Sequence, residues 1–206
     1  MQGVIAPLVR KGATARLLAL GHVAPLLAGL NRGELERLAI VQSSPDCAHP
    51  APTGLSAYTI VAAPDALPFA ESLFDQVLVA HSLEFAERPR QVLRELWRVL
   101  APASEMILII PNRAGLWTHF EATPFGQGRP WGRNELMRLL ADSMFEPLSW
   151  RSALAAPPVW GLRWLDKPLT RLVPRIGGVH IVVARKTDGL SGMPVGKVAL
   201  FSPAAA

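Results

Sequence analysis

An acid and a histidine stand at the two ends of one segment, "DALPFAESLFDQVLVAH", which runs from Asp65 to His81. Asp65 precedes a short hydrophobic turn, and His81 follows an apolar run with the composition of a buried strand. A carboxylate can accept hydrogen bonds from a ligand, and an imidazole can exchange a proton near neutral pH. The segment is therefore the first candidate for a site, if the fold brings its two ends together.

The elements around this segment alternate between strand and helix. Apolar residues at helical spacing predict helices over 88–102, ended by Pro102, and over 134–145, with Asn134 as the N-terminal cap. Further helices are predicted from 21 to Leu30, with Gly33 as a left-handed cap, and over 159–174. Residues 43–56 are expected to form a loop. Runs rich in Val, Ile and Leu predict buried strands at 15–20, 36–42, 58–63, 74–81, 105–111, 145–154 and 178–186.

This alternation is typical of a doubly wound α/β fold, with a mostly parallel, Rossmann-like sheet of about seven strands and helices on both faces. Residues 1–186 are expected to form a single domain, and 187–206 a disordered C-terminal tail. Ligands of such sheets bind beyond the carboxyl ends of the strands. The residues expected at that rim are Gly21, His22, Gln42, Asp65, His81, Pro111 and Asn112.

Composition excludes several classes of protein. The chain has 206 residues, half of them hydrophobic, which is enough for one domain with a core. No apolar run reaches the roughly 20 residues of a membrane helix. The apolar stretch near the N-terminus is interrupted by His22, Pro25 and Gly29, so it does not have the pattern of a signal peptide. We expect a cytoplasmic protein without a membrane partner.

Metal and nucleic-acid sites are not indicated either. The single cysteine, Cys47, excludes an internal disulfide, and the five histidines show no metal-ligand spacing. His180 lies inside an apolar strand, where a core or edge position is the simpler interpretation. The net charge of +5 comes mainly from arginines scattered beside acids, with no basic run interleaved with aromatic residues. We therefore expect no nucleic-acid partner.

The segment from Asp65 to Trp117 resembles the class I S-adenosylmethionine-dependent methyltransferases, of the small single-domain bacterial type. Members of that family read as an acid before "LPF", "FD" opening a strand, "H-x-L-E-H", a helix "L-x-E-x-x-R-V-L", a "P-G-G" turn and a strand ending in "P-N". This chain has "DALPFAESLFDQVLVAHSLEF" and then "VLRELWRVLAPASEMILIIPNRAGLW" in the same order. The continuation "GLWTHFEATPFGQGRPWGRNELMRLL" resembles a bacterial subgroup without an established substrate, which extends the likeness over most of the chain.

The resemblance implies S-adenosylmethionine as the cofactor. Asp65 would accept a hydrogen bond from the adenine amino group, Ala66 would be the neighbouring backbone contact, and Leu67 part of the pocket wall. Without the resemblance, Asp65 is a residue that caps a turn before a strand.

The first two strands would hold the rest of the cofactor. The turn at Gly21, with Ala19 and His22 beside it, would hold the methionine end, and Gln42 would contact the ribose. His81 would lie beside the cofactor, either as a base or as a packing residue.

The acceptor would bind after the fifth strand, at Asn112, Trp117, His119 and Arg129. Aromatic residues and arginines there could hold a planar or anionic small molecule, or they could pack within a folded loop. Glu84 and the helix that begins near Arg88 are interpreted as structural. The expected reaction is a single displacement that transfers the methyl group to a small-molecule acceptor.

The chain departs from the family at several positions. Ala19 stands where a glycine is expected, Gln42 replaces an acid, and Phe85 replaces a histidine. "P-G-G" has become Pro102-Ala103-Ser104, where a left-handed non-glycine residue costs about 1–2 kcal/mol. These departures support an alternative hypothesis, which is a non-catalytic binding or scaffold protein of the same fold that has lost cofactor affinity. A dinucleotide enzyme is the third hypothesis, and the absence of G-x-G-x-x-G after any strand speaks against it.

Overall fold

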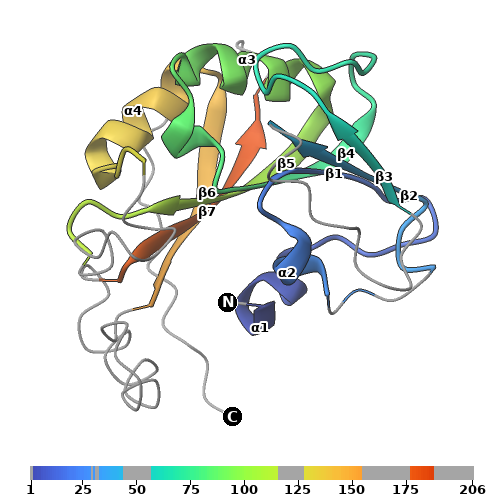
Figure 1. Ribbon diagram of the computed structural model, residues 1–206, viewed down its shortest axis with the longest axis horizontal. Coiled ribbons are helices and arrows are strands. Elements are labelled where there is room, and N and C mark those ends of the chain that lie inside the picture. The colour runs from blue at the N-terminus through green and yellow to red at the C-terminus, as the bar shows by residue number, and fades with distance from the viewer. Residues whose placement is uncertain are drawn as a thin grey trace.

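Seven strands form a single sheet in the computed structural model, which describes residues 2–28, 30, 33–43, 57–115, 128–154 and 177–187 (Figure 1). Their order across the sheet is β3-β2-β1-β4-β5-β7-β6. The strands are β1 (Arg16–Gly21), β2 (Arg37–Gln42), β3 (Ala57–Val61), β4 (Phe74–Ala80), β5 (Leu100–Pro111), β6 (Phe145–Ala153) and β7 (Val179–Lys186).

The sheet is parallel from β3 to β5, and β7 runs antiparallel between β5 and β6. This confirms the predicted doubly wound, mostly parallel sheet of about seven strands. The chain order reverses between β1 and β4, where Gly21 is in register with Ala80. Ligands of open α/β sheets bind at such a switch point, beyond the carboxyl ends of the strands.

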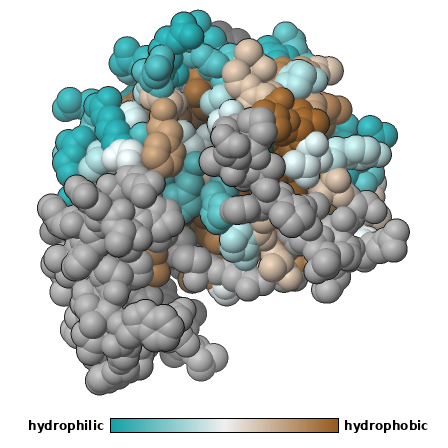
Figure 2. Space-filling view, in the orientation of Figure 1, coloured by the Kyte–Doolittle hydropathy of each residue, from teal (hydrophilic) through white to brown (hydrophobic). Residues whose placement is uncertain are grey.

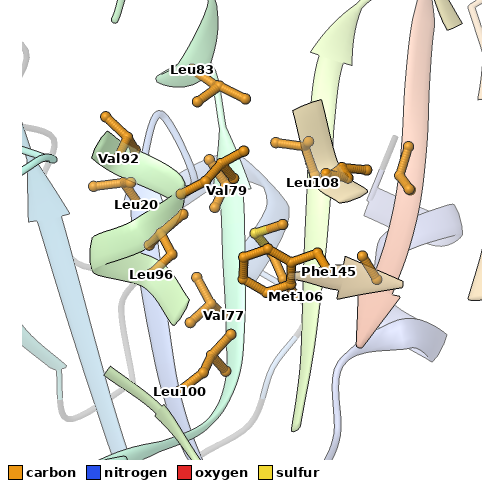
Figure 3. Packing of buried hydrophobic residues seen from close by; sticks show 14 of the residues in the cluster. Leu20, Val77, Val79, Leu83, Val92, Leu96, Leu100, Met106, Leu108 and Phe145 are labelled. Carbon is orange, nitrogen blue, oxygen red and sulfur yellow. The ribbon is translucent and has the colours of Figure 1, made fainter. Parts of the chain in front are cut away.

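Helices cover both faces of the sheet, as predicted. The helices α3 (Pro89–Val99) and α4 (Arg133–Asp142) lie on one face, and α1 (Gln2–Ile5), the 3-10 turn Ala6–Leu8 and α2 (Ala24–Leu27) lie on the other (Figure 1). Figure 3 shows the core beneath α3, where Leu96 packs over the strands together with Val77 and Met106. Fully burying a side chain of this size stabilises the fold by about 1.5–3 kcal/mol. This packing fixes the rim of the sheet that carries the site.

Three of the predicted helices have different boundaries in the structure. The helix expected to reach Leu30 ends at Leu27, and Gly33 takes its positive φ of 92° well beyond that end. α3 ends at Val99, before Pro102, because Leu100 is already extended and pairs with Phe74 of β4. α4 runs from Arg133 to Asp142 rather than over 134–145. Its N-cap is Gly132, so the predicted cap Asn134 is a residue within the first turn.

A bulge replaces the family's glycine turn. Phe74 of β4 pairs with Leu100 of β5, and the next pair is Gln76 with Glu105. More residues therefore lie between the two paired positions on β5 than on β4, and the surplus forms the bulge. Ala103 lies in this bulge with a φ of 55°. Of Pro102, Ala103 and Ser104, only Ala103 takes the left-handed conformation.

Replacing Ala103 by glycine is expected to raise the free energy of unfolding by about 1 kcal/mol, because glycine adopts the left-handed conformation without strain. The side chain of Ala103 is exposed, so little packing is lost. The measurement is the denaturant midpoint at an unchanged m-value. Ala101→Gly, at a position in the same strand without positive φ, is the matched control and should lower stability. If both variants lose the same free energy of unfolding, the backbone at Ala103 is not strained.

Several predictions lie outside the described residues. The helix predicted at 159–174 and nearly all of the loop at 43–56 and the tail at 187–206 fall there, so the domain boundaries stay predictions. No helix in the described ranges is long and apolar enough to cross a membrane.

Candidate functional site

The ends of β1 and β4 approach each other at a position that only glycine can occupy. Gly21 has a φ of 87°, and a Cβ atom on it would lie 2.2 Å from the carbonyl oxygen of Ala80. The same carbonyl accepts a hydrogen bond from the backbone N–H of His22 at 2.9 Å. The predicted glycine turn therefore lies at the switch point of the sheet, where the absence of a side chain lets the backbones of β1 and β4 come close together.

His81 leaves β4 in a strained conformation. Its φ is 52°, a left-handed value that costs a non-glycine residue about 1–2 kcal/mol. Its ring lies 6.1 Å from the ring of His22 between centroids, in an edge-to-face arrangement. Such outliers gather at functional sites, where the surrounding structure holds them in place. The structure thus brings Gly21, His22 and His81 together at one rim.

Glu84 completes this group, although sequence reasoning interprets it as structural. Its side chain is 0% exposed, and Oε1 lies 3.0 Å from Nδ1 of His81. Oε2 has no hydrogen-bond partner among the described residues. A carboxylate in this position favours the tautomer of His81 with its proton on Nδ1. The available signal is the acid of the "H-x-L-E" motif, three residues after the histidine.

Asp65 lies in a separate small pocket beside this rim. The pocket measures about 260 Å³, and Ser43, Ser82, Phe85 and Arg88 also line it. The carboxylate of Asp65 is partly exposed, with Oδ2 at 3.4 Å from a guanidinium nitrogen of Arg88. The hydroxyl of Ser82 is buried and has no hydrogen-bond partner within the described ranges. An acid and a hydroxyl at one pocket suit a ligand that offers several hydrogen-bonding groups.

A clamp from α3 fixes the loop that carries Asp65. Arg98 donates hydrogen bonds to the carbonyls of Leu67, at 3.0 Å, and Phe69, at 2.8 Å, and pairs with Glu95 at 2.8 Å. Glu95 also accepts a hydrogen bond from the N–H of Leu67 at 3.1 Å. The bond to Arg98 keeps the pKa of Glu95 below its usual value despite partial burial. These two residues are the acid and arginine of "L-x-E-x-x-R-V-L", and sequence reasoning gives them no role.

The remaining residues that were predicted to contact the cofactor are buried or already hydrogen-bonded within the protein. The N–H of Ala66 donates to the carbonyl of Ala63 at 3.1 Å, so a ligand contact there requires the turn to share or release that bond. Ala19 and Leu67 are buried in the two core clusters rather than exposed at the rim. Gln42 is buried at the end of β2, one residue beyond the position paired with Leu20 of β1.

A larger cleft of about 1440 Å³ holds two of the predicted acceptor residues, Asn112 and Arg129. Asn112 is buried and uses its amide in the fold: Nδ2 donates to the carbonyl of Gly177 at 2.7 Å, and Oδ1 accepts from the N–H of Ala114 at 3.1 Å. Arg129 lies with Cζ 4.7 Å from the ring centroid of Trp131. Trp117 and His119 lie outside the described residues.

His180 stands at the start of β7 on the wall of this cleft. The indole N–H of Trp150 donates to its Nδ1 at 3.1 Å, which assigns the ring proton to Nε2. Burial, reinforced by the charge of Arg133, lowers the pKa of His180 to about 4. His180 is therefore neutral in the folded protein near neutral pH.

The low pKa of His180 predicts a loss of stability in acid. The unfolded chain binds the proton at its ordinary pKa of about 6.5, whereas the folded chain resists it until about 4. Stability should therefore fall as pH drops from about 6.5 to 4, by about 3 kcal/mol from this residue. Urea unfolding of wild type and His180→Gln over pH 4–7 measures this, and the variant should show a shallower slope. Parallel pH curves would contradict the account.

Comparison with known proteins finds a family model and relatives that match part of the chain. A family model described as a methyltransferase domain matches residues 21–108, a range that begins at the glycine of the β1 turn and includes Asp65, His81 and Glu84. An uncharacterized protein of Mycobacterium tuberculosis is 33% identical over 101 residues, which is 46% of this chain and 35% of that protein. An uncharacterized protein of Mycobacterium bovis matches equally. The match thus spans about a third of the length of these relatives.

Solved structures share the fold across nearly the whole chain. A methyltransferase of Thermotoga maritima, described as S-adenosylmethionine-dependent and as a possible histamine N-methyltransferase, has a TM-score of 0.66 at 18% identity, over 90% of this chain and 87% of its own. An S-adenosylmethionine-dependent methyltransferase of Mesorhizobium loti has a TM-score of 0.63 at 12% identity, over 89% and 96%. At these identities the likeness establishes the fold.

Proposed function

We propose that the chain is a class I S-adenosylmethionine-dependent methyltransferase, which transfers the methyl group of S-adenosylmethionine to a small-molecule acceptor. The match of residues 21–108 to a methyltransferase family model and the shared fold support this proposal. One observation carries the proposal: the glycine turn at Gly21, where β1 closely approaches β4, lies directly beside the strained His81 and its buried partner Glu84. A fold that keeps a glycine-only turn and a strained histidine at its switch point retains the features of a working site.

The described residues fit the cofactor. Asp65 would accept the adenine amino group, and the hydroxyl of Ser82 offers a donor and an acceptor at the same pocket. Gln42 would contact the ribose through a neutral hydrogen bond, which is weaker than the usual contact of an acid. The turn at Gly21, with His22 beside it, would take the methionine end. Arg98 and Glu95 support this site by holding the loop before β4.

Bound S-adenosylmethionine would supply a methyl group on a sulfonium, which a nitrogen or oxygen of the acceptor attacks at carbon while the S–C bond breaks and S-adenosylhomocysteine leaves. The protein contributes position and a base. With Nδ1–H donated to Glu84, His81 accepts the acceptor's N–H or O–H proton at Nε2 as the new bond to carbon forms. The carboxylate of Glu84 stabilises the imidazolium that results. The proton thus moves from the acceptor to His81.

The acceptor would enter from the larger cleft, where Asn112 and Arg129 lie. Trp117 and His119 remain proposed contacts from the segment between the described ranges. A cytoplasmic location and the absence of a nucleic-acid partner stay predictions.

The test is formation of S-adenosylhomocysteine. Purified protein is incubated with S-adenosylmethionine and fractionated small-molecule extracts, and both the by-product and a product heavier by one CH₂ are followed by mass spectrometry. We expect at least one fraction to give both, in multiple turnovers. If no fraction raises S-adenosylhomocysteine above the protein-free control, the enzyme proposal fails in favour of a non-catalytic protein of this fold.

A further inference from the structure

The larger cleft has an excess of positive charge. It lies between α3 and α4 and reaches the ends of β5 and β6, and Figure 2 shows hydrophilic residues gathered over these two helices. Only two acids, Glu135 and Asp142, are among the described residues that line it. The arginines that line it are Arg88, Arg90, Arg113, Arg129, Arg133 and Arg138.

The two acids do not neutralise this charge. Asp142 pairs with Arg90 at 2.7 Å, whereas Glu135 is shared between Arg113 and Arg129. Burial alone would raise the pKa of Glu135, but the two arginines outweigh it and hold the pKa below its usual value. Glu135 is therefore ionised and already committed to both neighbours.

Arg133 and Arg138 have no ion-pair partner within the described part of the chain. Arg133 lies over the ring of Trp150, with Cζ 5.0 Å from the centroid. Trp150 in turn donates its N–H to His180. A guanidinium held over an aromatic ring keeps its N–H donors available at a fixed place, which suits planar recognition of an oxyanion.

Two buried donors distinguish this cleft from a merely basic surface. His180 is 4% exposed and Trp131 is 3% exposed, and both line the cleft. The Nε2 of His180 and the Nε1 of Trp131 have no hydrogen-bond partner among the described residues. Because the indole of Trp150 occupies Nδ1, Nε2 of His180 is a donor, as is the indole nitrogen of Trp131. Buried donors normally have a partner, and both of these could be matched by an acceptor-only group after a small side-chain adjustment.

We propose that the cleft between α3 and α4 binds an oxyanion, a carboxylate or a phosphate monoester, carried by the methyl acceptor. Arg133 and Arg138 supply the charge, and His180 and Trp131 supply neutral donors. The identification of the anion's carrier as the methyl acceptor rests on the proposed function. The anion site itself rests only on the cleft.

The test is calorimetric titration of the full chain with benzoate and with phenyl phosphate, and with benzamide as the neutral probe. Benzoate or phenyl phosphate should bind saturably, and the tighter of the two names the anion class. In the double variant Arg133→Gln/Arg138→Gln, affinity should fall tenfold or more, the size expected for charge-assisted hydrogen bonds. Arg37→Gln, an exposed arginine at the start of β2, is the matched control and should bind as wild type does.

Three outcomes overturn the proposal: no saturable anion binding, equal binding of benzamide, or an equal loss of affinity in Arg37→Gln, which marks general attraction by a basic protein. His180→Phe keeps a ring at the buried position and removes the donor, so it should weaken anion binding while urea unfolding verifies that the variant is folded. Unchanged anion affinity in this variant removes His180 from the site.

Titration with S-adenosylmethionine separates this proposal from the proposed function. Anion binding in the cleft without cofactor binding supports the site and contradicts the methyltransferase proposal. Cofactor binding without anion binding contradicts the anion site and leaves the methyltransferase proposal standing.

Discussion

Replacing Gly21 by alanine is expected to remove measurable binding of S-adenosylmethionine and to lower the free energy of unfolding by about 2–5 kcal/mol. The left-handed φ of 87° costs alanine about 1–2 kcal/mol. The added Cβ would also lie 2.2 Å from the carbonyl oxygen of Ala80, so the ends of β1 and β4 must separate, at a cost of about 1–3 kcal/mol more. Urea unfolding and calorimetric titration measure the two effects.

Gly33→Ala is the matched control for this prediction. Gly33 has a φ of 92°, but a Cβ atom there would meet nothing within 4 Å. The control should therefore lose only the conformational cost of about 1–2 kcal/mol and keep its cofactor affinity. If the two variants lose equal stability, the close approach at Ala80 is not what the glycine permits.

Replacing His81 by glutamine is expected to slow methyl transfer by about 10²–10⁴-fold, the range for loss of a general base. Glutamine can still donate a hydrogen bond to Glu84 but cannot take up the acceptor's proton. The measurement is the single-turnover rate of S-adenosylhomocysteine formation with an acceptor found in the extract assay.

Cofactor affinity separates the two possible roles of His81. If His81 is the base, His81→Gln binds S-adenosylmethionine about as well as wild type and only the rate falls. A packing role predicts the opposite pattern, with weaker cofactor binding and a rate at saturation close to that of wild type.

The central strands β1, β2, β4 and β5 were predictable because each has an apolar run that is buried on both faces of the parallel part of the sheet. The predicted burial of the third strand was wrong, because β3 lies at the edge of the sheet and exposes Tyr58 and Val61.

The helix ends were not predictable, because they depend on contacts distant in sequence. Leu100, for example, leaves the helix to pair with Phe74 and to accept a hydrogen bond from Lys186 at 2.6 Å. The end of α3 is thus set by pairing with β4 and contact with β7, not by Pro102.

The candidate site also has a part that the sequence predicts and a part that it does not. Gly21 ends β1, His81 directly follows β4, and Asp65 lies in the turn after β3, so strand prediction together with family spacing places them at the rim. The cleft joins residues from α3, the segment after β5, α4, β6 and β7, and no short motif contains them. His180 illustrates the limit: its apolar strand correctly indicates burial, but the donor it presents depends on Trp150, thirty residues earlier.

Calorimetric titration of S-adenosylmethionine into wild type, Asp65→Ala and Glu36→Ala tests the account most directly. Asp65 and Glu36 each pair with one arginine, at 3.4 and 3.6 Å, but only Asp65 lines the pocket assigned to adenine. The account predicts saturable binding by wild type and Glu36→Ala, and affinity at least about tenfold weaker in Asp65→Ala. Absence of wild-type binding up to millimolar cofactor, or equal affinity in all three proteins, would contradict it.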